Sequence, residues 1–358
     1  MDSFAFWYKK RNPESEPTST LSAVMNFNLW CECGWDVKDK QSKTLAKEEY
    51  PYLDIGFKIT NLSLASDLYL FLPLVIEEDQ KEAHLEDLGC KFKDTALVDA
   101  TFNESFKTSI SASSKTIDVE SSDEDKFKIY QLDIENDVSL SRFSTGTILT
   151  LNTDKIISNQ TKDVKPDESK AEDPVYYFRF RIKGCPLEFL IHKYSARSKV
   201  LQGLFNETYM IDFRYHNIRS LDNSLIERFY ESGNGVVDVT ALHFLLMTKA
   251  YVDVTSQGFT NVRKIEFNVW KEYVDGHDTK DLVAYHFADK PKKDGDSKFI
   301  GSSELFAKFR IERSLVRAYV VCATLIGVLG SAVWCLIEYL CTLLGSLVGS
   351  LIQIIGNL

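Results

Sequence analysis

The sequence predicts an α+β protein that is mainly β: a sandwich-like head of antiparallel strands, followed by a C-terminal transmembrane α-helical element. The first observation behind this fold class is alternation, as where Met25, Phe27 and Leu29 are separated by single polar residues, which is typical of a half-buried strand. The second is the tail 318–358, whose only charged side chain is Glu338. Because about 20 helical residues cross the hydrocarbon core of a bilayer, this tail predicts a membrane element.

Residues 1–158 are predicted to form an N-terminal β-rich domain. Segments with a period of two residues recur along it and are separated by turn residues. A sandwich of antiparallel sheets is the expected packing, although the strand order does not follow from the sequence. The expected strands are 25–31, 53–60, 67–76, 95–102, 126–134 and 145–152.

Residues 159–174 contain almost no apolar side chain and are predicted to be a linker or a long loop. We take this segment as the boundary between two β-rich halves; a long surface loop within one domain is the alternative. The second β-rich domain, 175–300, is expected to include a helix at 222–231 that an Asp or Asn at its start caps. Its expected strands are 175–182, 208–216, 234–239 and 263–273.

The C-terminal part of the chain is predicted to be helical. A connecting helix, 301–317, is expected to lead into membrane helices formed by 318–358. The apolar tail is too long for one upright span, so we expect either two spans or one span continuing into a second helix.

One face of the tail helices is small and polar. An intramembrane carboxylate indicates a functional site, and Gly345 and Gly349 have the spacing of a small-residue association motif. The same face could line an aqueous pore, although helix packing alone and an interfacial helix lying on the leaflet are alternatives. The expected pore-lining residues recur at steps of three and four: Glu338, Thr342, Gly345, Ser346, Gly349, Ser350 and Gln353.

Charge predicts the orientation of the head. Lys308, Arg310, Arg313 and Arg317 precede the apolar run, and no Lys or Arg follows it. Positive residues beside a span stay on the cytoplasmic side, so the head is expected in the cytoplasm and the tail in the cell inner membrane. The seven cysteines, an odd number at irregular spacing, agree with a reducing compartment.

Sequence motifs give no indication of an enzyme. Walker-type loops, Gly-x-Ser-x-Gly and His-Glu-x-x-His are absent. The six histidines are scattered singly and make no metal-ligand spacing. We therefore expect no catalytic residues, no metal and no cofactor.

A basic segment, 176–220, stands apart in a chain whose net charge is −10. Alternation should place Tyr177 and three cations on one face of a strand, a combination suited to phosphate contacts and base stacking. Pairing with the acidic remainder of the protein and contact with anionic lipid are the alternatives. The expected ligand-binding residues are Tyr177, Arg179, Arg181, Lys183, Lys193, Arg197, Lys199 and Arg214.

The order of parts resembles the transmembrane effectors of bacterial anti-phage abortive-infection systems, and most of all the Hailong type. The resemblance depends on the basic segment 177–183 and the Gly/Ser-faced tail 338–356. It implies a homo-oligomer, taken as a tetramer, that forms an ion-conducting pore controlled by a nucleotide or single-stranded nucleic acid. It also implies a nucleotidyltransferase partner that makes this ligand. The alternative is a membrane-tethered scaffold that binds a protein partner.

Overall fold

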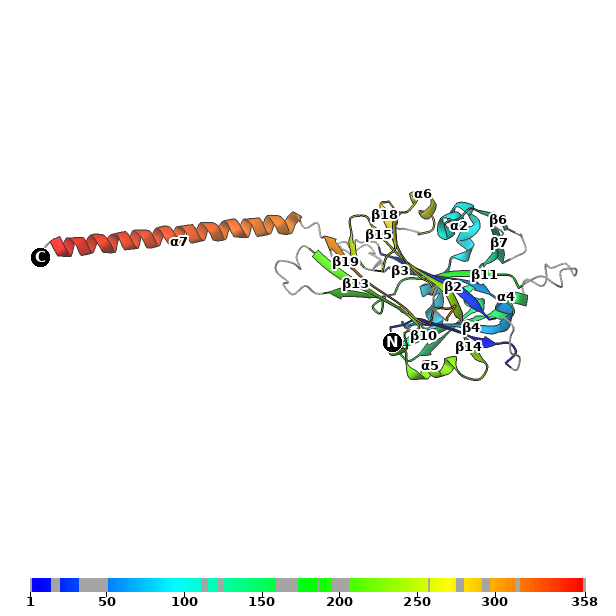
Figure 1. Ribbon diagram of the computed structural model, residues 1–358. Coiled ribbons are helices and arrows are strands. Elements are labelled where there is room, and N and C mark those ends of the chain that lie inside the picture. The colour runs from blue at the N-terminus through cyan, green and yellow to red at the C-terminus, as the bar shows by residue number, and fades with distance from the viewer. Residues whose placement is uncertain are drawn as a thin grey trace. The chain divides into compact units, whose positions relative to one another are not determined.

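The structure is a computed structural model, and it divides the chain into two units. The head comprises Met1–Tyr194 and Thr208–Ile311, and the second unit comprises Ser195–Glu207 and Glu312–Leu358. The head is built mainly of β-strands (Figure 1), and the second unit contains the long helix α7 (Val316–Gly356). The residues described are 2–13, 20–31, 51–110, 115–121, 125–158, 173–185, 187–194, 206–256, 258–274, 280–291, 297–312 and 316–356.

A ten-stranded sheet runs through the head. Its order is β17-β18-β15-β2-β3-β11-β8-β7-β6, and the short β5 also pairs with β11. Most neighbours are antiparallel, but β2 pairs with β15 and β8 with β11 in parallel. The strands are β2 (Ser22–Trp30), β3 (Tyr52–Thr60), β5 (Leu85–Asp87), β6 (Phe106–Ile110), β7 (Thr116–Ser121), β8 (Lys126–Tyr130), β11 (Tyr176–Ile182), β15 (Asp238–Lys249), β17 (Asn261–Lys264) and β18 (Leu282–Asp289).

Two smaller sheets complete the β-structure of the described residues. A five-stranded sheet has the order β14-β1-β4-β10-β9, and a four-stranded sheet has the order β12-β13-β19-β16. The five strands are β1 (Ala5–Lys10), β4 (Ala65–Leu72), β9 (Val138–Phe143), β10 (Gly146–Asn152) and β14 (Asn234–Val236). The four strands are β12 (Ile191–Tyr194), β13 (Asn206–Tyr215), β16 (Asp253–Thr255) and β19 (Ser303–Glu312).

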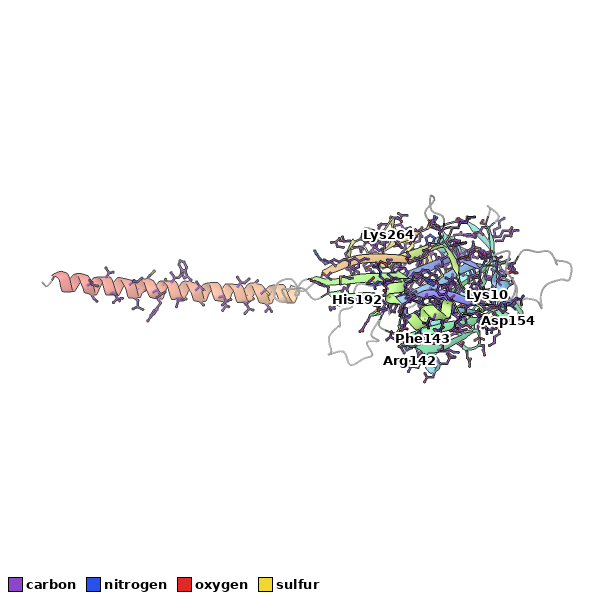
Figure 2. All side chains as sticks on the ribbon, turned by 60° about the horizontal axis from the view of Figure 1, so that its bottom comes forward. Lys10, Arg142, Phe143, Asp154, His192 and Lys264 are labelled. Carbon is purple, nitrogen blue, oxygen red and sulfur yellow. The ribbon has the colours of Figure 1, made fainter. Side chains whose placement is uncertain are left out.

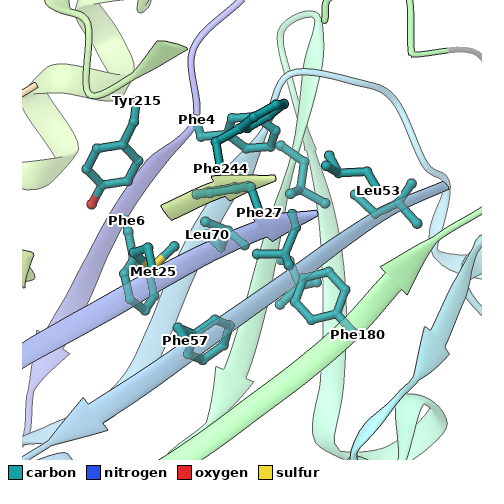
Figure 3. Close-up of a cluster of buried hydrophobic side chains, with 14 of the residues drawn as sticks. Phe4, Phe6, Met25, Phe27, Leu53, Phe57, Leu70, Phe180, Tyr215 and Phe244 are labelled. Atoms are coloured by element: carbon teal, nitrogen blue, oxygen red, sulfur yellow. The ribbon is translucent and has the colours of Figure 1, made fainter. Parts of the chain in front are cut away.

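The main hydrophobic core lies between the large sheet and the two smaller ones. Alternate residues of β2 and β3, such as Met25 and Phe57, pack against Phe6 and Leu70 of the five-stranded sheet (Figure 3). The four-stranded sheet adds apolar side chains such as Phe309 to the same core. This arrangement confirms the prediction of a mainly β head, because each alternating strand buries its apolar face.

Short helices cover the outer faces of the sheets. A second core joins the far face of the large sheet to η3, α2 and α6, and a third joins the five-stranded sheet to α5. The helices of the head are α1 (Lys81–His84), α2 (Thr95–Phe102), α3 (Ile134–Asp137), α4 (Thr153–Ser158), α5 (Asn223–Phe229) and α6 (Phe267–Trp270). The 3₁₀ turns are η1 (Leu62–Leu64), η2 (Glu78–Gln80), η3 (Gly89–Lys93) and η4 (Ile218–Ser220).

Three predicted elements have a different secondary structure. The expected strand 95–102 is the helix α2, whose cap Asp94 accepts a hydrogen bond from Ala96 N at 3.0 Å; this cap outweighs the β-branched composition. The expected strand 263–273 ends at Lys264 and is followed by α6. Of the expected connecting helix 301–317, residues 303–312 are instead β19, because Leu305, Ala307 and Phe309 recur every second position and bury one face. Residues 316 and 317 belong to α7, and 313–315 lie outside the described residues.

The predicted boundary between two β-rich domains is also wrong. Strand β11, which follows the expected linker, pairs with β3 over seven positions, and β15 pairs with β2. Both expected domains therefore share one sheet and one core. Of the linker itself, residues 159–172 lie outside the described part of the chain.

A buried histidine joins the first strand to α5. The backbone N–H of Phe6 donates to His216 Nε2 at 2.7 Å, and the ring of His216 stacks on Phe229 with a centroid distance of 5.4 Å. Burial lowers the pKa of His216 to about 4. The neutral ring is the folded form, since a protonated Nε2 could not accept the Phe6 hydrogen bond.

We expect His216 to make the stability of the head depend on pH between about 6.5 and about 4. In this window an unfolded histidine binds a proton that the folded one does not, so the free energy of unfolding falls as the pH falls. His216→Gln should make the fall in the free energy of unfolding across this pH window smaller by roughly 3 kcal/mol. The measurement is denaturant unfolding of the full chain in detergent across this pH range.

The comparison with the unsubstituted protein separates the effect of His216 from those of two half-buried groups, His243 and Asp87. Burial also lowers the pKa of His243 to about 4, which acts in the same direction. Burial raises the pKa of Asp87 to about 6, which acts in the opposite direction. His192→Gln, at an exposed position, is the control, and equal pH slopes in all three proteins would contradict the prediction.

Candidate functional site

The basic strand predicted to bind a ligand is buried. Tyr177, Arg179 and Arg181 share one face of β11, as alternation predicted, but each is at most 1% exposed. The segments that cover this face, η3, α2 and α6 with the residues after it, form the covering layer. Its aromatic rings, among them Phe92 and Tyr273, lie over the face. The prediction that these three residues form a nucleic-acid surface is therefore wrong, because both faces of the central strand carry a packed layer.

Asp54 holds the guanidinium of Arg181. The two residues lie directly opposite each other on β3 and β11, and Arg181 donates through Nε and Nη2 to the two carboxylate oxygens at 2.7 and 3.1 Å. Trp30 Nε1 and Tyr273 Oη donate to Asp54 Oδ2 at 2.7 and 2.8 Å. Such a bidentate, charge-assisted pair fixes the geometry of both side chains.

Arg179 lacks a carboxylate in hydrogen-bond contact among the described residues. It donates through Nε to Tyr273 Oη at 2.6 Å and through Nη1 to Tyr177 Oη at 2.9 Å, and Asp54 Oδ2 is 3.7 Å from its Nη2. The guanidinium also lies 5.6 Å from the ring centroid of Tyr273. Two buried positive charges thus face one buried negative charge, and hydroxyls and ring faces supply the remaining stabilisation.

The electrostatics of this cluster keep Asp54 ionised. Burial raises the pKa of Asp54, but the charges of Arg181 and Arg179 and the hydrogen bonds from Arg181 and Trp30 bring it below its ordinary value. The cluster also needs a glycine, since a Cβ at Gly56 would overlap with the hydroxyl of Tyr177. The arrangement is suited to holding the covering layer on the sheet.

The other expected ligand residues do not gather at one place. Lys183 forms an ion pair with Glu86 at 2.8 Å, and Arg214 Nε donates to Asp212 at 2.9 Å. Lys193 is exposed on β12, with its ammonium 5.6 Å from the ring centroid of Tyr209. Arg197 and Lys199 lie outside the described residues.

Sequence reasoning missed the acid that explains the buried arginines. Asp54 lies between the apolar Leu53 and Ile55 of β3, and this alternation by itself predicts a solvated acid rather than a buried one. Its aromatic partners, Trp30 and Tyr273, lie far away in the sequence and carried no signal. Among the described residues, no three His, Cys, Asp or Glu side chains are placed to hold a metal ion.

The apolar tail forms a single helix. α7 extends without a break over 41 residues, so the predicted division into two helices is wrong. Its segment Val320–Leu351, 32 residues, is long and apolar enough to span a membrane. Figure 2 shows side chains projecting outward from the middle part of α7. At 1.5 Å per residue this segment measures about 48 Å.

A continuous helix orders the expected pore-lining residues by angle. At about 100° per residue, Thr342, Gly345 and Gly349 lie within roughly 40° of Glu338 around the helix, whereas Ser346 and Ser350 lie roughly 80° and 120° away. Gln353 lies at roughly 60°; its backbone belongs to α7. The polar face is thus narrower than the predicted set.

We name this narrow face the α7 stripe, and it consists of two series of residues spaced seven apart. Thr324, Ser331, Glu338 and Gly345 recur at this spacing, and so do Cys335, Thr342, Gly349 and Gly356. A heptad repeat corresponds to helices that pack with a left-handed supercoil. Small side chains in the repeat allow close approach of the helix backbones.

The hydroxyl groups of α7 have partners within the helix. Each Ser or Thr donates to a backbone carbonyl three or four residues earlier, which satisfies it without a second chain. These bonds are Thr324 to Val320 at 2.7 Å, Ser331 to Gly327 at 3.0 Å, Thr342 to Glu338 at 2.7 Å, Ser346 to Leu343 at 2.8 Å and Ser350 to Ser346 at 3.0 Å. Within its apolar segment, Val320–Leu351, Glu338 is the only charged residue.

Comparison with known proteins adds no relative. No protein-family model matches the sequence, and no curated protein matches it. The buried cluster of the head and the helix α7 are therefore the two features of the chain that bear on its function.

We expect Asp54→Asn to destabilise the head by about 3–5 kcal/mol, since it leaves two buried guanidinium groups without a negative charge. The measurement is denaturant unfolding of the full chain in detergent, followed by tryptophan fluorescence. Asp125→Asn is the control, because it breaks a more exposed ion pair with Lys58 and should cost less than about 1 kcal/mol. A change below about 1 kcal/mol in Asp54→Asn would contradict the structural role of the cluster.

Proposed function

We propose that this protein is a membrane effector whose α7 helices assemble from several copies into a cation-conducting pore. The observation that carries the proposal is the α7 stripe, which places one carboxylate, Glu338, near the middle of the otherwise uncharged, membrane-length segment Val320–Leu351. A ring of such carboxylates around a common axis attracts cations, and small residues on either side of it leave room for a path. In lipid, a lone carboxylate is unfavourable unless other copies or water surround it.

The head controls the assembly in this proposal. It lies in the cytoplasm beside the inner membrane, in keeping with the cations that precede α7. A nucleotide or single-stranded nucleic acid, made by a partner nucleotidyltransferase during anti-phage defence, remains the proposed signal. Its binding residues are not those of the buried cluster, so the ligand has to bind elsewhere on the head.

A membrane-tethered scaffold is the second candidate. The internal hydrogen bonds of the Ser and Thr residues of α7 support it, since they allow the helix to serve as a solitary anchor with little polar cost apart from Glu338. In this case the head would bind a protein partner, and the stripe would have no role in conduction.

Ion flux in proteoliposomes distinguishes the two candidates. Gly349→Leu places a bulky side chain in the stripe and should lower cation flux by about tenfold, the effect of ~1.4 kcal/mol of lost helix association. Glu338→Gln should lower the preference for cations over anions, because it removes the ring of charge.

Gly330→Leu is the matched control for the helix. It makes the same change in α7, and a Cβ added at Gly330 or at Gly349 would meet no neighbouring side chain within 4 Å. Gly330 lies roughly 80° from Glu338, outside the stripe, so its flux should match that of the unsubstituted protein. Unchanged flux and ion preference in both stripe variants would eliminate the pore and leave the anchored scaffold.

A further inference from the structure

Strand β19 presents an aromatic, two cations and one acid, Glu304, on its outer face. Its inner residues, such as Leu305 and Phe309, are buried in the main core, while Phe306 is 60% exposed and Lys308 and Arg310 are exposed. Neither cation forms an ion pair with any residue in the described part of the chain. This includes Asp253, which lies opposite Arg310 in the register of β16 and β19.

The position of β19 in the chain brings this face near the membrane. β19 ends at Glu312 and α7 begins at Val316, so a short link joins the strand to the helix. At no more than about 3.6 Å per residue, Arg310 lies within roughly 22 Å of the first residue of α7. A protein with a net charge of −10 is repelled by an anionic surface except where its cations face that surface.

We propose that the outer face of β19 lies on an anionic lipid surface, with Phe306 at the level of the headgroups and Lys308 and Arg310 bound to lipid phosphates. This inference rests on the proposed insertion of α7 in the bilayer. Aromatic side chains suit the interface because they combine an apolar ring with tolerance of water at its edge. Tyr194, at the end of β12, which β13 separates from β19, is 54% exposed on the same sheet and extends this surface.

The alternative is a strand that stands upright on the membrane. Glu312 lies six positions after Phe306, and six positions correspond to about 20 Å along a strand. That height is about twice the Debye length of roughly 8–10 Å, so an upright strand would hold Phe306 away from lipid and gain little from the charge of Lys308. Contact between position 306 and lipid therefore separates the two arrangements.

The experiment uses the full chain with p-benzoylphenylalanine in place of Phe306. The protein is placed in nanodiscs of phosphatidylcholine alone or mixed with phosphatidylglycerol and irradiated, and lipid adducts on the peptide are measured by mass spectrometry. We expect lipid adducts at position 306, several times more abundant with phosphatidylglycerol. Lys308→Gln combined with Arg310→Gln should reduce the yield to that of phosphatidylcholine alone, and so should high salt.

The same probe at Ile110 is the control for position. Ile110 is 49% exposed on β6, and Figure 1 shows β6 and β19 at opposite ends of the head. Lys107→Gln combined with Lys264→Gln is the control for charge, since both residues are exposed and outside the four-stranded sheet. This pair should leave the yield at 306 unchanged.

Equal yields at 306 and 110, or a yield at 306 independent of phosphatidylglycerol or of Lys308 and Arg310, would overturn the inference. Retention of the protein in the nanodisc after alkaline washing tests the insertion of α7 separately. Loss of the protein from the disc would contradict the proposed function, whereas retention without adducts would overturn the lipid contact alone.

Discussion

The bidentate pair of Asp54 and Arg181 is the interaction on which the architecture of the head depends. It lies where three separate parts of the chain meet: β3 supplies the acid, β11 supplies the cation, and the segment after α6 supplies Tyr273. A carboxylate buried without a cation would be strongly unfavourable, so the sheet register and the covering layer have to form together. The second guanidinium, that of Arg179, adds to this requirement because its partner Tyr177 lies on β11 and its partner Tyr273 lies after α6.

Much of the fold followed from local patterns. Alternation predicted β2, β3 and β11 because a strand with one apolar face must bury it. An Asp or Asn cap predicted the start of α5, and Asp222 is the residue that caps it. The same rule assigned the correct residues of β11 to one face. It could not show that this face is also buried, because the cover consists of η3, α2 and α6, and their contacts with β11 are long-range.

For the candidate membrane site, the sequence located the functional residue but not the secondary structure around it. Composition alone located the apolar tail and Glu338, since a charge is conspicuous in such a segment. The number of helices was not predictable from composition, because glycines such as Gly330 break a helix or remain within it according to their surroundings. With the helix continuous, the seven-residue repeat extends back to Thr324, which a division into two helices had hidden.

The length of α7 has a consequence for where such a protein could work. A hydrocarbon core of about 30 Å is shorter than the roughly 48 Å of its apolar segment, so an inserted α7 would tilt, thicken the surrounding bilayer or extend beyond it. Each response shifts the depth of Glu338, and a thicker membrane would accommodate the helix with less tilt. In the proposed assembly, the crossing angle between copies would then vary with lipid chain length, and bilayer thickness itself would influence the assembly.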